Sequence, residues 1–202
     1  MRHALLICAL LAAPAAAMAD SFSYTYVDGR YVSVDADAAS VNGEGGVLTG
    51  SYALPAYAAL PEIFYLSGSV SGLKSQSFTS GGVRGSFQSY AGSLRLGAHH
   101  AITPVLDLIG NAGAIYGELK GKGGFSGSDN STGYVGELGL RMALIPQLEL
   151  SGLYDYTHVF GNSSSDFTAN LEYKATSHIS AVVSADFGRS ADGYGFGARY
   201  NF

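Results

Sequence analysis

The sequence predicts an all-β chain that folds as a ten-stranded antiparallel transmembrane β-barrel, and three observations support this prediction. Apolar and polar or small residues alternate with a period of two along most of the chain, which is the period of a β-strand. Gly, Ser, Asn and Pro separate the alternating segments, as expected between short regular strands. After the N-terminal segment, no unbroken apolar stretch reaches the roughly 18 residues that a membrane-spanning helix needs.

The N-terminal segment is predicted to be a secretory signal peptide. Arg2 and His3 precede an apolar run, and Ala17-Met18-Ala19 matches an A-x-A cleavage site. We therefore divide the chain into a signal peptide, residues 1–19, and a β-barrel domain, residues 20–202.

The amino-acid composition argues against disulfide bonds in the mature chain and against nucleic-acid binding. The only cysteine, Cys8, lies inside the predicted signal peptide, so the mature chain is expected to contain no disulfide. Without Arg2 the chain carries ten basic residues against sixteen acidic ones. This net negative charge argues against binding to nucleic acid.

The alternation defines ten candidate strands, each with one apolar face. They are Phe22 to Val34, Glu44 to Leu54, Ile63 to Leu73, Phe87 to Ala98, Val105 to Glu118, Thr132 to Leu144, Leu148 to Phe160, Asp166 to Lys174, Ile179 to Gly188 and Gly193 to Phe202. The orientation of the first strand stays open, because its aromatic residues share a face with Asp28 and Arg30.

Strand length favours a membrane barrel over a soluble β-sandwich. Sandwich strands are commonly about 5–6 residues long, whereas most of the candidate strands are about twice that length. Eleven residues at about 3.3 Å each, tilted by about 40°, cover roughly 27 Å, close to the ~25 Å apolar band of such barrels.

The connections alternate between two classes. An even number of strands places both termini on the periplasmic side. The outer loops are then Asp35 to Gly43, Lys74 to Ser86, Leu119 to Ser131, Gly161 to Ser165 and Arg189 to Asp192, which are rich in Gly and Ser. The predicted periplasmic turns are shorter on average and contain proline in three of four cases: Pro55 to Glu62, His99 to Pro104, Ile145 to Gln147 and Ala175 to His178.

Three segments resemble small outer-membrane β-barrel proteins of Gram-negative bacteria, of OmpA-like or OmpX-like size. They are SYTYVDGRYVSVDADA from Ser23, GSYAL from Gly50 and GFGARYNF from Gly195. The last resembles the C-terminal assembly signal of such barrels, with Tyr194, Phe196, Tyr200 and Phe202 on one face. The resemblance implies insertion by the barrel-assembly machinery after delivery by periplasmic chaperones, and it implies no catalytic motif.

Charged residues on the inward faces form a candidate lumen charge network. Its members are Arg95, Asp107, Glu137, Arg141, Glu149 and Asp155. Arg141 with Glu149, and Arg95 with Asp107, are placed to form cross-strand pairs about two predicted turns. The charges either act as a selectivity filter or neutralise one another in a plugged or water-filled interior. We favour neutralisation.

Basic residues near the outer loops are candidate contacts for lipopolysaccharide, whose phosphates attract ammonium and guanidinium groups. These residues are Lys74, Arg84, Lys120 and Lys122, and the alternative is that they only provide solubility. Asp35 and Asp37 lack a full set of cation ligands and predict a solvated turn rather than a metal site.

No motif predicts catalysis or a cofactor. Asp155 and His158 point to opposite faces of one strand, and His99, His100 and His178 fall in predicted turns. GKGGFSG from Gly121 lacks the ending of a phosphate-binding loop and predicts a flexible loop tip.

The sequence thus predicts a monomeric outer-membrane protein that contacts lipid and lipopolysaccharide, with a structural or surface-interaction role and no enzymatic activity. A narrow porin-like channel is the first alternative, and a soluble secreted β-sandwich is the second.

Overall fold

The computed structural model describes residues 22–36, 41–55, 63–80, 82–124, 126–188 and 191–202. The predicted signal peptide, residues 1–19, lies outside the described residues, as does Asp37.

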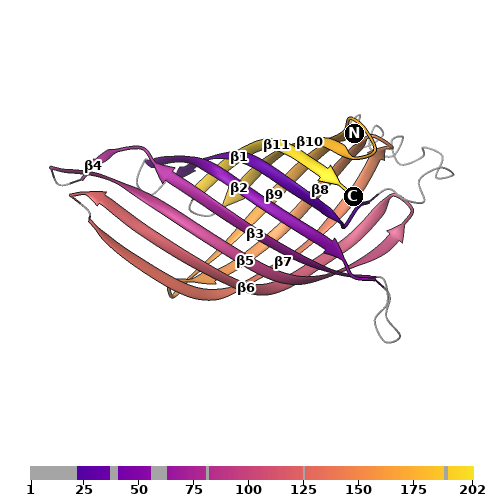
Figure 1. Ribbon diagram of the computed structural model, residues 1–202, viewed down its shortest axis with the longest axis horizontal. Coiled ribbons are helices and arrows are strands. Elements are labelled where there is room, and N and C mark those ends of the chain that lie inside the picture. The colour runs from indigo at the N-terminus through magenta and orange to yellow at the C-terminus, as the bar shows by residue number, and fades with distance from the viewer. Residues whose placement is uncertain (1–21, 37–40, 56–62, 81, 125, 189–190) are drawn as a thin grey trace, which may run out of the picture.

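The described chain forms a single antiparallel sheet (Figure 1). Its strands are β1 (Tyr26–Ala36), β2 (Val41–Ala53), β3 (Phe64–Ser75), β4 (Phe78–Ser80), β5 (Val83–Thr103), β6 (Leu106–Gly123), β7 (Gly127–Ile145), β8 (Leu148–Val159), β9 (Asn162–Lys174), β10 (Ile179–Gly188) and β11 (Ala191–Asn201).

Two pairings between strands distant in sequence close the sheet into a barrel. β1 pairs with β11, and β3 pairs with β5, so that ten strands form a closed cylinder. This confirms the predicted ten-stranded barrel. The short β4 is additional: it pairs with β5 at one end and was predicted to be loop, because three residues carry no alternation signal.

We call the end where β1 begins and β11 ends the inner end, and the opposite end, which carries β4, the outer end (Figure 1). At the outer end β5, β6 and β7 continue past their neighbours, and we call this extension the outer ridge. The predicted third outer loop is therefore wrong: β6 runs to Gly123 and β7 starts at Gly127. The predicted GKGGFSG loop tip lies largely within these two strand ends.

At the inner end, the predicted turn from His99 to Pro104 is also wrong in its extent. β5 continues through both histidines to Thr103, and only Pro104 and Val105 connect it to β6. A register shift between Ala101 and Thr103 accommodates the extra residues.

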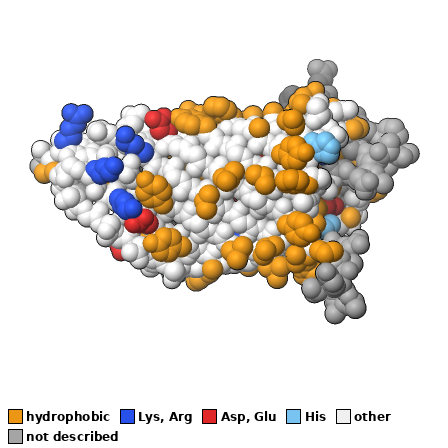
Figure 2. All heavy atoms as spheres, in the orientation of Figure 1, with side chains coloured by type: hydrophobic (Ala, Val, Ile, Leu, Met, Phe, Trp, Pro, Cys, Tyr) orange, Lys and Arg blue, Asp and Glu red, His pale blue; other side chains and the backbone are white. Residues whose placement is uncertain are grey.

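The two faces of the sheet separate apolar from polar side chains. Outward residues such as Leu94 and Leu138, each 59% exposed, cover the barrel surface (Figure 2). Asp28 and Arg30 lie on the inward face of β1, and Tyr24, just before the strand, also faces inward, which settles the orientation of the first strand. A sheet closed on itself with its apolar face outside excludes the soluble sandwich. Among the described residues, no helix is long and apolar enough to cross a membrane.

Inward glycines let neighbouring side chains and backbones approach closely. Gly97 lies opposite Tyr65 in the β3–β5 register, and a Cβ at Gly97 would lie 2.2 Å from the Tyr65 ring. The ring therefore occupies the space that a larger residue would need, and it lies buried at the inner end of the lumen.

We predict that Gly97→Ala destabilises the folded barrel by about 1–3 kcal/mol, because the added methyl group overpacks against Tyr65. Gly92→Ala is the matched control on the outward face of the same strand, where the nearest atom lies 3.8 Å from the new Cβ. Urea unfolding in detergent micelles measures both free energies. Equal unfolding free energies for the two variants would contradict this packing.

Candidate functional site

The lumen collects the inward polar side chains, and its first ionic cluster lies at the seam between β1 and β11. Asp28 is directly opposite Arg199 in register, and it accepts a hydrogen bond from Arg199 Nη2 at 3.1 Å. Arg30 donates to the same carboxylate through Nε and Nη2, each at 2.8 Å. Arg199 Nη1 reaches across β10 and donates to Glu172 Oε2 at 2.6 Å. Asp28 is 0% exposed, so two guanidinium groups compensate its burial.

The second ionic cluster lies on the other side of the lumen. Arg141 Nε donates to Glu149 Oε1 at 2.6 Å, and its guanidinium carbon lies 4.7 Å from the centre of the Tyr24 ring. The Tyr24 hydroxyl donates to Asp107 Oδ2 at 2.8 Å. The His99 ring stacks on Tyr24 with centroids 4.0 Å apart, and His99 Nδ1 lies 3.4 Å from Asp107 Oδ2.

Apolar side chains fill the space between these clusters at the inner end. Tyr24, Tyr65 and Ile109 form a buried group, with Phe22, Ala53 and Leu153 packed against it. Val182 is 1% exposed beside the seam cluster. The inner part of the lumen is therefore packed with side chains.

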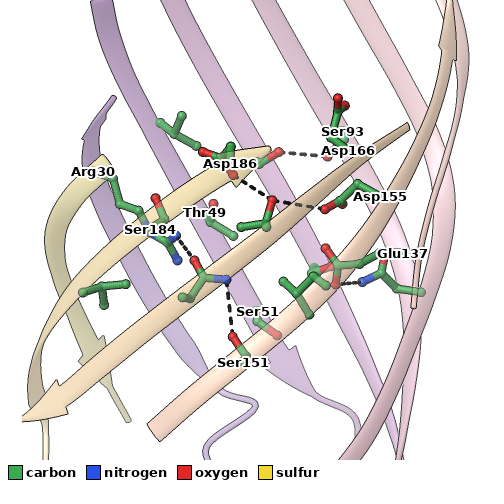
Figure 3. Close-up of a pocket in the computed structure, with 18 of the residues that line it drawn as sticks. Arg30, Thr49, Ser51, Ser93, Glu137, Ser151, Asp155, Asp166, Ser184 and Asp186 are labelled. Carbon is green, nitrogen blue, oxygen red and sulfur yellow. Dashed lines mark hydrogen bonds between the residues drawn. The ribbon is translucent and has the colours of Figure 1, made fainter. Parts of the chain in front are cut away.

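Toward the outer end the lumen contains a cavity of about 540 Å³ (Figure 3). It extends from the level of Arg141 and Glu149 to Val34 and Asp192, and its wall is rich in Ser, Thr and Asn. Seven carboxylates and four guanidinium groups line it: Glu137, Glu149, Asp155, Asp166, Glu172, Asp186 and Asp192, and Arg30, Arg95, Arg141 and Arg199.

A third cluster lies in the wall of this cavity. Arg95 Nη1 lies 3.3 Å from Glu137 Oε2 and 4.0 Å from Asp155 Oδ1. Asn111 Nδ2 donates to Glu137 Oε1 at 2.7 Å. Arg95 is directly opposite Gly113, where a Cβ would clash with the backbone of Leu94 and Arg95, so β5 and β6 approach closely at this position.

All six residues of the predicted charge network face the lumen, and the structure settles the two predicted pairs. The contact between Arg141 and Glu149 is present. The pair between Arg95 and Asp107 is wrong, because the β5–β6 turn lies at Pro104 and Val105, which sets Asp107 opposite Ala101. Whether these charges act in function stays a prediction.

Sequence reasoning missed the seam cluster and the environment of His99. In a closed barrel the last strand pairs with the first, and counting antiparallel from Phe202 beside Thr25 sets Asp28 opposite Arg199. Extending the alternation of β5 by a few residues would have turned His99 into the lumen beside Asp107.

Of the other described histidines, His158 and His178 lie outside the lumen. His158 stacks on the exposed Tyr134 and contacts Ser163 Oγ at 2.9 Å, so it points away from Asp155, as predicted. His178 lies in the predicted turn, and its Nδ1 contacts the Asn201 carbonyl at 2.9 Å. Among the described residues, no group of three or more His, Cys, Asp or Glu is placed to hold a metal ion.

The four predicted lipopolysaccharide contacts lie in strands rather than in loops. Lys74 is in β3, Arg84 in β5, and Lys120 and Lys122 in β6. Lys74 is opposite Gln88, and Gln88 is opposite Lys120, so the three side chains form one row across the outer face of the sheet. Figure 2 shows basic side chains gathered at this end of the molecule.

Comparison with known proteins assigns the chain to a family. A family model described as "Outer membrane protein beta-barrel domain" matches residues 4–202. The chain belongs to this family. No curated protein matches the chain in sequence.

Solved structures with a similar fold are outer-membrane barrels. The translocator domain of the autotransporter NalP from Neisseria meningitidis is 17% identical, with a TM-score of 0.52, and the match covers 99% of this chain and 96% of that one. Ail of Yersinia pestis is 19% identical, with a TM-score of 0.45 and 89% and 97% coverage. OprG from Pseudomonas aeruginosa is 15% identical, with a TM-score of 0.45 and 90% and 98% coverage.

Both termini of bacterial outer-membrane barrels with an even number of strands face the periplasm, so we predict that the inner end, where β1 begins and β11 ends, faces the periplasm. Outward aromatic residues occupy the membrane-facing surface, as in interfacial girdles. The predicted assembly-signal residues are among them: Tyr194, Phe196, Tyr200 and Phe202 are all exposed on the outer face of β11 or just beyond it.

We predict that Asp28→Asn lowers the free energy of unfolding of this barrel by about 3–5 kcal/mol, because it leaves Arg30 and Arg199 without their shared carboxylate in a buried site. Glu118→Gln is the control. It removes the exposed ion pair between Glu118 Oε2 and Lys120 Nζ, which are 3.0 Å apart. Exposed ion pairs contribute about 0–1 kcal/mol to stability. Urea unfolding in micelles measures the free energy of unfolding of both variants. A decrease of less than 1 kcal/mol for Asp28→Asn would show that the seam cluster of Asp28, Arg30, Glu172 and Arg199 does not stabilise the barrel.

Proposed function

We propose that this outer-membrane barrel is a non-enzymatic, monomeric surface-interaction protein whose outer ridge binds the phosphate groups of lipopolysaccharide. The observation that supports this proposal most directly is the position of the basic residues. Arg84, Lys120 and Lys122 lie on the outward face of the sheet, farther toward the outer end than the outward Tyr90 and Tyr116 of the same strands, and Lys74 lies on the neighbouring β3 opposite Gln88. Aromatic girdle residues mark the membrane interface, so the ammonium groups reach the depth of the lipid headgroups.

The register groups these basic residues into a compact basic face. Lys120 follows Lys74 and Gln88 in one row, and Lys122 lies opposite Ser86 in the next row. Arg84 is one further step along β5 on the same face. Neighbouring rows of a sheet lie within reach of long side chains, and several cations in a small area suit a phosphorylated headgroup.

Two carboxylates share this face. Glu118 Oε2 lies 3.0 Å from Lys120 Nζ, and Glu44 is opposite Lys74 and accepts a hydrogen bond from the Tyr31 hydroxyl at 2.6 Å. Four basic residues against two acidic ones leave the face positive, although the mature chain as a whole is acidic. This local reversal of charge is typical of a surface that attracts anions.

The porin-like alternative draws support from the lumen cavity. We propose instead that the barrel does not conduct, because the seam cluster, the Arg141 cluster and the Tyr24–Tyr65–Ile109 group lie across the path between the cavity and the periplasm.

We predict that replacing Lys74, Arg84, Lys120 and Lys122 by Gln weakens lipopolysaccharide binding about tenfold. Four exposed charge pairs at about 0.3–0.5 kcal/mol each give this factor. Equilibrium binding of labelled lipopolysaccharide to the barrel in zwitterionic micelles measures the effect.

Ser86→Gln with Ser128→Gln is the matched control, because it adds amide side chains to the same rows without changing the charge. The native protein is also expected to bind dephosphorylated lipopolysaccharide more weakly. Unchanged affinity of the four-residue variant would refute the proposal.

The position of Phe202 gives a separate prediction about assembly of the barrel in the cell. Phe202 N donates to the Thr25 carbonyl at 3.1 Å, so the terminal residue takes part in the seam as well as in the assembly signal that the resemblance implies. We predict that deleting Phe202 reduces the folded, heat-modifiable form in cells by impairing handling by the barrel-assembly machinery and periplasmic chaperones. Phe187→Leu, an apolar exchange at an exposed outward position of β10 outside the assembly signal, is the control. Normal insertion of the truncated chain would contradict this prediction.

A further inference from the structure

The outer half of the lumen cavity concentrates carboxylates from three consecutive strands. Asp155 on β8, Asp166 on β9 and Asp186 on β10 all line it (Figure 3). Asp155 and Asp166 are directly opposite in register. Like charges in directly opposite positions destabilise a sheet, so this arrangement costs stability in the empty barrel.

These carboxylates differ from those of the inner half in their partners. Asp28, Glu149 and Glu172 each accept a hydrogen bond from an arginine. Within the described part of the chain, Asp166 and Asp186 form no ion pair, and the cation nearest to Asp155 is Arg95 at 4.0 Å.

The Thr168 hydroxyl lies 2.7 Å from Asp186 Oδ1 and 3.4 Å from Asp155 Oδ2. Its single hydrogen serves one of these carboxylates at a time. The Thr168 hydroxyl therefore cannot satisfy Asp155 and Asp186 at the same time.

A buried acceptor in the cavity wall points to a shortage of donors. Asn111 Oδ1 is buried and accepts no hydrogen bond within the described part of the chain. Glu149, at the floor of the cavity, is by contrast matched by Arg141 at 2.6 Å and by Lys174 Nζ at 3.8 Å. Because unpaired buried acceptors are costly, the cavity is suited to a ligand that brings N–H donors.

The distribution of the carboxylates along the cavity indicates which class of cation can bind them. No three of the described acidic or histidine side chains are close enough to hold one metal ion. The carboxylates instead line a long cavity of about 540 Å³ from its floor to its outer end. A ligand with several amines along a flexible chain can place one ammonium group near each acceptor, which a compact ion cannot.

We propose that the lumen cavity binds a linear diamine or polyamine that enters from the outer end, with ammonium groups at Asp155, Asp166 and Asp186. The two ionic clusters and the Tyr24–Tyr65–Ile109 group fill the inner end of the lumen, so the cavity is closed at that end. This site is independent of the basic face on the outer ridge, which binds the opposite charge on the opposite surface of the sheet.

The test is isothermal titration calorimetry of spermidine into the folded mature chain in zwitterionic micelles free of lipopolysaccharide. Saturable binding that weakens as salt increases is expected for the native barrel. Asp166→Asn with Asp186→Asn is expected to weaken it at least tenfold. Glu44→Gln with Glu118→Gln, which removes two negative charges from the outer surface, is the matched control and is expected to leave binding unchanged.

A second readout separates a binding role from a structural one. Without ligand, Asp166→Asn is expected to raise the urea midpoint of the barrel, because it removes the repulsion from Asp155. A lower midpoint would indicate a structural role.

Absence of saturable spermidine binding, or equal binding by the two double variants, would overturn the proposal. Tighter binding of Mg²⁺ or Ca²⁺ than of spermidine at the same residues would overturn the class of ligand. Lipopolysaccharide binding of the Asp166, Asp186 variant is expected to be unchanged.

Discussion

A strand that crosses hydrocarbon must pair every backbone N–H and C=O group, because each unpaired group costs several kcal/mol there. The pairings of β1 with β11 and of β3 with β5 meet this requirement by removing both edges of the sheet. Closure then fixes the rest of the arrangement. One face of every strand contacts lipid and is apolar, and the other face is confined to a narrow lumen. Polar and charged side chains on that inner face must find their partners across the lumen.

The partners are distributed unevenly along the barrel axis. At the inner end, Asp28, Glu149 and Glu172 are matched by arginines, and aromatic rings cover the remaining space. In the outer half, Asp155, Asp166 and Asp186 exceed the available cations. The same sheet thus carries an inner end with paired charges, an acidic cavity and, on its outward surface at the outer end, a basic face. These three regions differ in charge because they face protein interior, cavity and membrane interface.

Alternation along the chain was sufficient to predict the ten barrel strands, because the contrast between lipid and lumen is imposed at every second residue. The ends of β5, β6 and β7 were not predictable in this way. Residues such as Gly121 and Ser128 lie farther toward the outer end than the outward Tyr116 and Tyr134 of their strands, where apolar and polar residues no longer alternate, and the segment therefore resembles a loop. β4 lies in the same region and was missed for the same reason.

Pairing in the lumen was predictable only where the turn was placed correctly. Arg141 and Glu149 flank the short turn at Pro146 and Gln147, and their contact is present. Arg95 was assigned to Asp107 because the preceding turn was placed too early. Antiparallel registers are set by turn position, so this error moved every partner along β5 and β6. Asp28 and Arg199 are far apart in sequence, and their contact follows from closure of the barrel rather than from any local pattern.

We propose that paired charges and aromatic rings close the inner end of the lumen. Single-channel recording of the folded protein in planar lipid bilayers measures this closure. A closed lumen gives a stable baseline without discrete conductance steps. Reproducible steps whose amplitude changes when Arg95 or Arg141 is substituted would contradict it, because they would place an open aqueous path through the residues that are assigned to the closed inner end and the cavity wall.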